Sequence, residues 1–277
     1  MAPDMELVGL VERSDRVNQV KDLVSCPVVD SVEKLTTPHG VALCIPSTLI
    51  SKVAPDYLSQ GIATVDGFDV HGQPMLDLLE KLDGAARAGE VASVSGSGWD
   101  PGTDSMVRAL FQIIAPQGIT HTNFGPGMSM GHTVAVKAVD GVKEALAITI
   151  PQGQGQHRRQ IYIELEPGAI YQDVKKKILT DNYFRHDKTK IIQVEDVAAL
   201  QDMGHGVHIQ RLGVASGVHN QVMDYKFRVT NPAVTAQVMV AGLRGALRQK
   251  PGSYVMMGLS PLDMLPGPRE KLIKELC

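Results

Sequence analysis

Two aspartates follow predicted strands in the first part of the sequence. Asp69 comes shortly after the apolar segment 62–66, and Asp100 follows the segment 91–94 by a short glycine-rich turn. The carboxyl ends of parallel strands line one crevice, so these carboxylates are expected to converge, where they could orient a cationic group or relay its proton. The alternatives are structural: Asp69 as an ordinary turn residue, and Asp100 as the cap of a helix starting at Pro101.

Three polar residues of the second half could bind an anion. Thr149, Arg159 and His205 lie near the ends of predicted strands, although they are far apart in the sequence. The planar guanidinium of an arginine matches a carboxylate, and a hydroxyl and an imidazole can add hydrogen bonds to the same group. The alternative, which composition alone favours, is that Arg158 and Arg159 form a solvated charge pair.

Other chemistries find no support in the sequence. His205 and His208 lie three residues apart on a predicted strand, so their side chains point to opposite faces, and we expect no metal site. There is no Gly-x-x-x-x-Gly-Lys-Ser/Thr loop, which argues against a nucleotide triphosphatase. There is also no Gly-x-Gly-x-x-Gly turn, the usual pyrophosphate site of a dinucleotide-binding sheet.

Short apolar segments and helical patterns alternate in the first hundred residues. Strands are predicted at 6–12, 41–45, 62–66 and 91–94. Helices are predicted from Ser47, the expected N-cap, to about residue 60, with Pro55 inside, and over 75–88. This alternation predicts an α/β fold, a Rossmann-like doubly wound parallel sheet whose ligands bind at the carboxyl ends of its strands.

The pattern changes after residue 100. A helix at about 104–115 and a turn-rich stretch at 123–132 precede long alternating strands, at 144–150, 159–165, 190–194, 207–214 and 222–229. Alternation of apolar and polar residues predicts a mostly antiparallel sheet with one buried face, and thus a second, α+β domain. Helices follow at about 232–248 and at the end of the chain. We expect a first domain of residues 1–98 with about 245–277, and a second of about 99–244.

Composition limits the class of protein. A chain of 277 residues suggests about two domains. No apolar run approaches the roughly 18 residues that span a bilayer, and the acidic start is unlike a signal peptide. Three cysteines cannot build a disulfide framework, and a net charge of -3 provides no basic surface for nucleic acid. We expect a cytoplasmic enzyme without membrane or nucleic-acid partners.

Four segments together resemble the meso-diaminopimelate dehydrogenase family. They are Pro-Asp-Met-Glu-Leu-Val-Gly (3–9), Val-Asp-Gly-Phe-Asp-Val-His (65–71), Ser-Gly-Trp-Asp-Pro-Gly (97–102) and Phe-Gly-Pro-Gly-Met-Ser-Met-Gly-His (124–132). The resemblance covers nearly the whole chain. It implies a homo-oligomer that carries out NADP-dependent oxidative deamination at the D-carbon of meso-diaminopimelate in bacterial lysine synthesis. The opening strand and glycine turn of the family are absent, so we expect the chain as written to bind NADP poorly.

The resemblance implies roles for the residues introduced above. Asp69 and Asp100 would be catalytic and hold the reacting ammonium group, while Thr149, Arg159 and His205 would hold the distal carboxylate. The other substrate-binding residues would be Trp99, Phe124, Met130, Gly131 and Asn231.

Four of these residues carry further implications or alternatives. Phe124 and Met130 resemble the subgroup with relaxed D-amino-acid specificity. Trp99 could equally pack in the core, and Asn231 could simply cap the helix that Pro232 starts.

A cofactor site is expected at the strand ends of the first domain. Arg13, with help from Arg16, would bind the ribose 2'-phosphate, although Glu12 is a residue type that favours the unphosphorylated ribose. The alternative for Arg13 is an ordinary surface charge. The other cofactor-binding residues implied by the resemblance are Ser14, Cys44, Ile45, Pro46, Ser47, Val65, Gly67 and Ser97. Two alternatives remain open: another Rossmann-type amino-acid or imine reductase, and a non-catalytic fragment that binds diaminopimelate or nothing.

Overall fold

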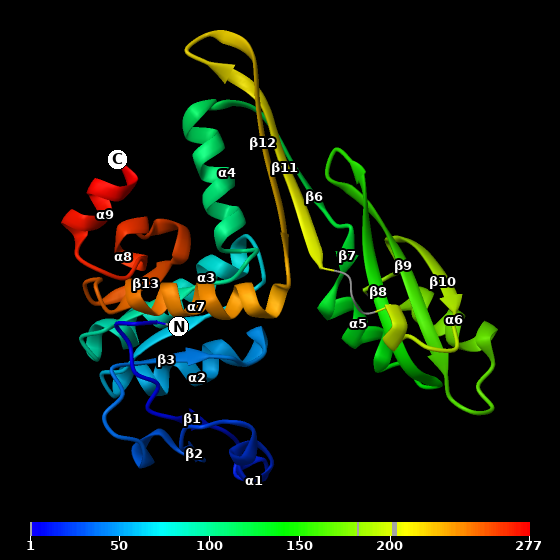
Figure 1. Ribbon diagram of the computed structural model, residues 1–277, viewed down its shortest axis with the longest axis horizontal. Coiled ribbons are helices and arrows are strands. Elements are labelled where there is room, and N and C mark those ends of the chain that lie inside the picture. Colours follow the sequence, from blue (N-terminus) through cyan, green and yellow to red (C-terminus); the bar gives the residue numbers. More distant parts are fainter. Residues whose placement is uncertain (1, 182, 201–203) are drawn as a thin grey trace. The chain divides into compact units, whose positions relative to one another are not determined.

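Residues 2–181, 183–200 and 204–277 are described by the computed structural model (Figure 1). Their contacts divide the chain into two compact units, Met1–Ser105 with Val234–Cys277, and Met106–Ala233. The helices α4 (Thr103–Ile114) and α7 (Asn231–Ala246) contribute residues to both units. Because of this sharing, the unit boundaries differ from the expected domain boundaries at residue 98 and about residue 245.

The first unit is built on a parallel sheet. Its strands lie in the order β13 (Gly252–Val255), β5 (Ala92–Ser95), β4 (Ala63–Asp66) and β3 (Gly40–Leu43). Every residue of β4 and β5 is buried, as expected of strands covered on both faces. The sequence pattern did not predict β13, which comes from the end of the chain and pairs with β5.

Helices cover both faces of this sheet. On one face α2 (Ser47–Ser59) and α3 (Gln73–Ala88) enclose an apolar core that includes Leu43, Ile50, Leu58, Phe68, Leu78 and Leu82. On the other face α7 approaches so closely that a Cβ on Gly242 would lie 2.5 Å from Ser97 Oγ. The parallel sheet with helices on both faces confirms the predicted α/β class. Helix α2 runs through Pro55 without a break.

The strand predicted at 6–12 is wrong in its length. Only β1 (Leu10–Val11) forms, and among the described residues its partner is β2 (Val28–Val29), in a separate two-stranded parallel sheet. A strand extends only as far as its partner pairs with it, which explains the short element. The remaining helices of this unit are α1 (Val17–Val20), α8 (Pro261–Met264) and α9 (Arg269–Leu276).

The described residues of the second unit form two sheets. One has the order β10 (Lys188–Gln193), β9 (Gln156–Leu165), β8 (Val142–Gly153) and β7 (Gly127–Met128), and only its β9–β10 pair is parallel. The other is antiparallel, with β11 (His205–Ala215) between β6 (Gln117–Phe124) and β12 (Val218–Val229). Figure 1 shows β11 and β12 as a long hairpin. The predicted, mostly antiparallel character is confirmed.

Helices α5 (Met130–Lys137) and α6 (Tyr171–Thr180) pack on one face of the mixed sheet, over a core that includes Val136, Ala147, Ile161, Ile163, Ile178 and Phe184. Neither helix was predicted, and α5 lies partly within the stretch expected to form turns. Within the described ranges, no helix is long and apolar enough to cross a membrane.

Candidate active site

Asp66 is a buried carboxylate at the carboxyl end of β4. Its Oδ1 accepts hydrogen bonds from the backbone N–H groups of Phe68 (2.9 Å) and Gly96 (3.4 Å), and its Oδ2 accepts one from Ser95 Oγ (2.8 Å). Its backbone oxygen accepts another from Ser97 N (2.8 Å). Burial raises the pKa of Asp66, and the hydrogen bonds to its carboxylate oppose that rise. Asp66 therefore ties together the two loops that follow β4 and β5.

The predicted residues Ser47 and Asp69 are in direct contact. Ser47 Oγ donates a hydrogen bond to Asp69 Oδ1 (2.5 Å) and accepts one from the backbone N–H of Asp69 (3.3 Å). The prediction that Ser47 caps α2 is wrong, because Pro46 occupies the capping position and Ser47 is the first helical residue. Asp69 is exposed, so its carboxylate is held in place and remains open to solvent.

The loop after β5 carries Ser97, Trp99 and Asp100. Ser97 is fully buried, and its Oγ has no hydrogen-bond partner among the described residues. The indole of Trp99 is buried, which agrees with the packing alternative. Asp100 is half-buried and does not cap a helix at Pro101, because α4 begins only at Thr103. The capping alternative for Asp100 is therefore wrong.

The other predicted cofactor residues of the sheet lie around β3 and β4. Cys44, Ile45 and Pro46 form the loop between β3 and α2. Gly67 directly follows β4. The side chain of Val65, within β4, is fully buried against α7, so it is part of the core of the unit.

Arg13 and Ser14 follow β1 and are exposed. The guanidinium of Arg13 lies 3.5 Å from Asp15 Oδ2, and its backbone N–H donates to Glu12 Oε1 (3.0 Å). Arg16 lies 4.0 Å from the same Glu12 oxygen. The end of β1 therefore presents two cations, each beside a carboxylate.

Thr149 and Arg159 lie opposite each other on β8 and β9. Two residues away on each strand, the opposed pair Ala147 and Ile161 is buried in the core beneath the helices. Because side chains alternate along a strand, Thr149 and Arg159 continue the same face. Both are buried, and Arg159 Nη1 donates a hydrogen bond to Thr149 Oγ1. An apolar stripe thus ends in a buried cation with a hydroxyl beside it.

His205, at the start of β11 in the other sheet, lies within the electrostatic influence of this cation. Gly127 pairs with Thr149, and a Cβ on Gly127 would lie 2.1 Å from Gly204 O and 2.5 Å from His205 Cα. Only glycine allows this approach of β7 to the start of β11. Burial lowers the pKa of His205, the charge of Arg159 lowers it further, and nearby backbone carbonyls oppose the change. The imidazole is therefore neutral at neutral pH.

The segment 127–131 has the Gly-x-Ser-x-Gly spacing of a hydrolase nucleophile, but its structure is different. Ser129 is the N-cap residue of α5 with extended backbone (φ -94, ψ 111). Its Oγ lies 2.8 Å from Nδ1 of His132 in the first turn of the same helix. Burial and the charge of Arg159 lower the pKa of His132 to about 4. The pair therefore forms the start of a helix rather than a strained nucleophile turn.

The other predicted substrate-binding residues lie at the ends of elements. Phe124 ends β6, Met130 and Gly131 begin α5, and Asn231 begins α7. Space is open where a Cβ on Gly131 would lie.

His208 is separate from His205. It forms a hydrogen bond with Asp224 on β12, with 2.6 Å between Nε2 and Oδ1. Among the described residues, no group of three or more His, Cys, Asp or Glu side chains is placed to hold a metal ion.

Two residues that the sequence analysis missed complete the surroundings of Arg159. Arg159 Nε donates to Asp187 Oδ2 (2.8 Å), and its Nη2 lies 3.1 Å from His157 Nε2. Side chains two residues apart on a strand lie on the same face, so the sequence could have indicated that His157 lies beside Arg159 on β9. No local pattern indicates Asp187, which reaches Arg159 because β10 pairs with β9, placing Thr189 opposite Arg159.

Comparisons with known proteins agree with one another. The profile of the diaminopimelic acid dehydrogenase C-terminal domain matches residues 98–155. The meso-diaminopimelate D-dehydrogenase of Bacteroides fragilis is 46% identical over 275 residues, which are 99% of this chain and 92% of that protein. The protein of the same name from Lysinibacillus sphaericus is 32% identical, over 89% of this chain and 82% of that protein. Among solved structures, C. glutamicum DAP dehydrogenase in complex with DAP has a similar fold, with a TM-score of 0.83 at 24% identity, over 99% of this chain and 92% of that one.

Proposed function

The chain belongs to the meso-diaminopimelate D-dehydrogenase family, and on this premise we propose a reaction for it. It oxidises meso-2,6-diaminopimelate at the D-centre, reversibly and with NADP, to L-2-amino-6-oxopimelate and ammonia. The oxo product cyclises to tetrahydrodipicolinate, a step in lysine biosynthesis. The reaction takes place in the cytoplasm.

The buried cation of Arg159 is the observation that carries this proposal. It is bonded to the hydroxyl of Thr149, and it lies close enough to the neutral imidazole of His205 to lower the pKa of that ring. A carboxylate there would gain charge-assisted hydrogen bonds. Diaminopimelate has a second carboxylate far from its reacting carbon, whereas a simple amino acid has none, so this site favours a dicarboxylate.

Asp69 and Asp100 are assigned to the reacting ammonium group. A hydride leaves the α-carbon only when the nitrogen lone pair is free, so the ammonium group must first lose a proton. The two carboxylates bind this group and accept its proton, and Ser47 orients Asp69 through their hydrogen bonds. NADP, when bound, supplies the hydride acceptor. Loss of the hydride from the α-carbon leaves an imine. Water adds to the imine carbon, and ammonia leaves.

Two features of the first unit fit NADP. Arg13 is an exposed cation beyond the end of β1, suited to the ribose 2'-phosphate. Ser97 Oγ is a buried hydroxyl without a partner among the described residues, at the carboxyl end of β5. We assign cofactor binding to this unit, and substrate binding and dimerisation to the second. The other assigned cofactor residues are Ser14, Cys44, Ile45, Pro46, Ser47 and Gly67; the expected contact with Val65 is dropped, because this residue is fully buried in the core.

An exposed apolar row supports a homo-oligomer. Ile119, Leu212 and Val222 lie directly opposite one another on β6, β11 and β12, and all three are exposed. Burying this row against a second copy would remove apolar surface from water. Sedimentation velocity of Leu212→Glu tests this assignment: a smaller species is expected, and an unchanged one contradicts it.

Initial rates of NADPH formation test the reaction itself. We expect turnover with meso-diaminopimelate and none with the LL-isomer, which has no D-centre. The rates with D-alanine and D-lysine test whether the protein also accepts other D-amino acids, as Phe124 and Met130 suggest. Turnover of another amino acid but not of meso-diaminopimelate would indicate a different reductase. Binding without turnover would indicate a non-catalytic protein.

A further inference from the structure

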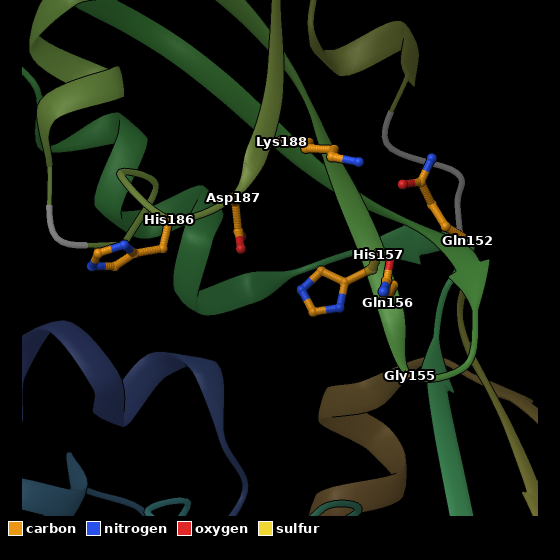
Figure 2. Close-up of a pocket in the computed structure, with 7 residues that line it drawn as sticks. All are labelled: Gln152, Gly155, Gln156, His157, His186, Asp187 and Lys188. Atoms are coloured by element: carbon orange, nitrogen blue, oxygen red, sulfur yellow. The ribbon is translucent and has the colours of Figure 1, made fainter.

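A cavity lies beside Arg159 in the second unit. Its volume is about 240 Å³, and it is lined by Gln152, Gly155, Gln156, His157, His186, Asp187 and Lys188. Figure 2 shows the carboxylate of Asp187 between the imidazole rings of His186 and His157, while the Lys188 ammonium group points toward Gln152. Of the seven lining residues, Asp187 is the only carboxylic acid. The lining thus carries one formal negative charge, at Asp187, and one formal positive charge, at Lys188, which lies on the side of Gln152.

One oxygen of Asp187 is occupied and the other is open. Oδ2 accepts the hydrogen bond from Arg159 Nε at 2.8 Å. Within the described part of the chain, no donor is bonded to Oδ1, and about a quarter of the side chain (23%) is exposed. The other nitrogens of Arg159 contact Thr149 and His157. Each guanidinium nitrogen therefore has one partner among the described residues, which leaves the second N–H of Nη1 and of Nη2 for a ligand, and the carboxylate that holds Nε can still accept a hydrogen bond.

Two histidines close to Arg159, His157 and His132, do not add a positive charge to this region. Burial lowers the pKa of His157, and the positive charge of Arg159 lowers it further. The same two causes lower the pKa of His132. Both of these rings are neutral near pH 7, so an ammonium group entering beside Arg159 is attracted by Asp187 and is not repelled by His157 or His132.

An amino-acid head carries its carboxylate and its ammonium group on the same carbon atom. If Arg159 binds the distal carboxylate of the substrate, the distal ammonium group must lie among the neighbours of Arg159. Resting on the proposed function, we propose that Asp187 binds the distal ammonium group of the substrate and so selects diaminopimelate over dicarboxylic D-amino acids that lack this group. Asp187 is then a specificity-determining residue, in addition to fixing Arg159.

These two roles of Asp187 are separable by substrate. D-2-aminopimelate has the reacting D-amine and both carboxylates but no distal ammonium group. In Asp187→Asn, the side-chain oxygen can still accept the hydrogen bond from Arg159 Nε, but the charge that attracts an ammonium group is gone. Asp187→Ala removes both functions.

The test compares kcat/KM for the two substrates in each variant. We expect Asp187→Asn to lose on the order of ten- to a hundredfold with meso-diaminopimelate and little with D-2-aminopimelate, because one charge-assisted contact is lost. Asp187→Ala should lower kcat/KM for both. An equal loss on both substrates in Asp187→Asn would show that Asp187 only positions Arg159. No loss on either would show that it does neither.

A matched control and a binding measurement complete the design. Asp140→Asn removes the same charge from an exposed position in the same unit and should leave both kcat/KM values unchanged. If the wild-type protein oxidises neither compound, the proposed function is overturned, but this result does not decide the role of Asp187. Calorimetric titration of the two compounds then makes the same comparison without turnover. If the wild-type protein binds meso-diaminopimelate more tightly than D-2-aminopimelate, and Asp187→Asn loses this difference, the role of Asp187 is supported. Equal binding of the two compounds by the wild-type protein would overturn it.

Discussion

Replacing Arg159 by methionine tests the distal-carboxylate site. The side chain is buried (8% exposed), and its guanidinium donates to Asp187, Thr149 and His157. A substrate carboxylate bound to it would form charge-assisted hydrogen bonds, whose loss typically costs about 1.5–3 kcal/mol. At about 1.4 kcal/mol per tenfold, the KM for meso-diaminopimelate should rise roughly ten- to a hundredfold. Because Arg159 does not bind the cofactor in this account, the KM for NADP should stay nearly unchanged.

The same substitution also has a structural cost. It leaves the partly exposed carboxylate of Asp187 without its cation, a loss of about 1–3 kcal/mol, against a typical domain stability of about 5–15 kcal/mol. The variant should therefore still fold. Arg158→Met is the matched control: the neighbouring residue points to the opposite face of β9, and its loss should leave both KM values unchanged. An unchanged KM for meso-diaminopimelate in Arg159→Met, or a parallel rise in both KM values, would refute the assignment.

Three further predictions concern the first unit. Asp100→Asn should reduce turnover far more than NADP binding, because an amide cannot accept the proton of the ammonium group; near wild-type turnover across pH would limit Asp100 to a structural role. Arg13→Ala should raise the KM for NADP and leave the KM for NAD nearly unchanged, and an equal effect on both cofactors would argue against 2'-phosphate binding. Burial raises the pKa of Asp66 above 3.8, its ordinary value. The protonated side chain therefore stabilises the folded protein fully below pH 3.8, and this contribution is lost as the pH rises through the raised pKa. The melting temperature of Asp66→Asn relative to wild type should therefore increase with pH across that window, and a difference independent of pH would contradict this.

Local periodicity was sufficient to predict much of the fold. The β4 and β5 segments are short apolar runs, and such runs in alternation with helical patterns indicate a parallel sheet. The polar residues after each strand were correctly placed at its carboxyl end, and Ser47 and Asp69 are in contact there. Thr149 and Arg159 likewise proved to be neighbours across two strands. These features follow from the spacing of apolar residues and from the order of the strands along the chain, so a single sequence is sufficient to predict them.

Features that depend on pairing between distant segments could not be predicted. Strand β13 is only four residues long and forms because β5 offers it an edge. Asp187 is 28 residues from Arg159 and meets it only through the parallel register of β10 on β9. Asp66 could be recognised as the end of a strand, but its burial follows from strands on both sides of β4. Helix α5 was missed because its first turn lies in a glycine-rich stretch typical of loops.

Hydrogen transfer from the D-centre is the most direct test of the central claim. Two samples of meso-diaminopimelate would carry deuterium on the D-centre carbon or on the L-centre carbon, and each would be incubated with the protein and NADP. Mass spectrometry of the resulting NADPH should find deuterium from the D-labelled sample only, with the L-label retained in the oxo product. Transfer from the L-centre, or NADPH formation without deuterium from either sample, would contradict the proposed reaction.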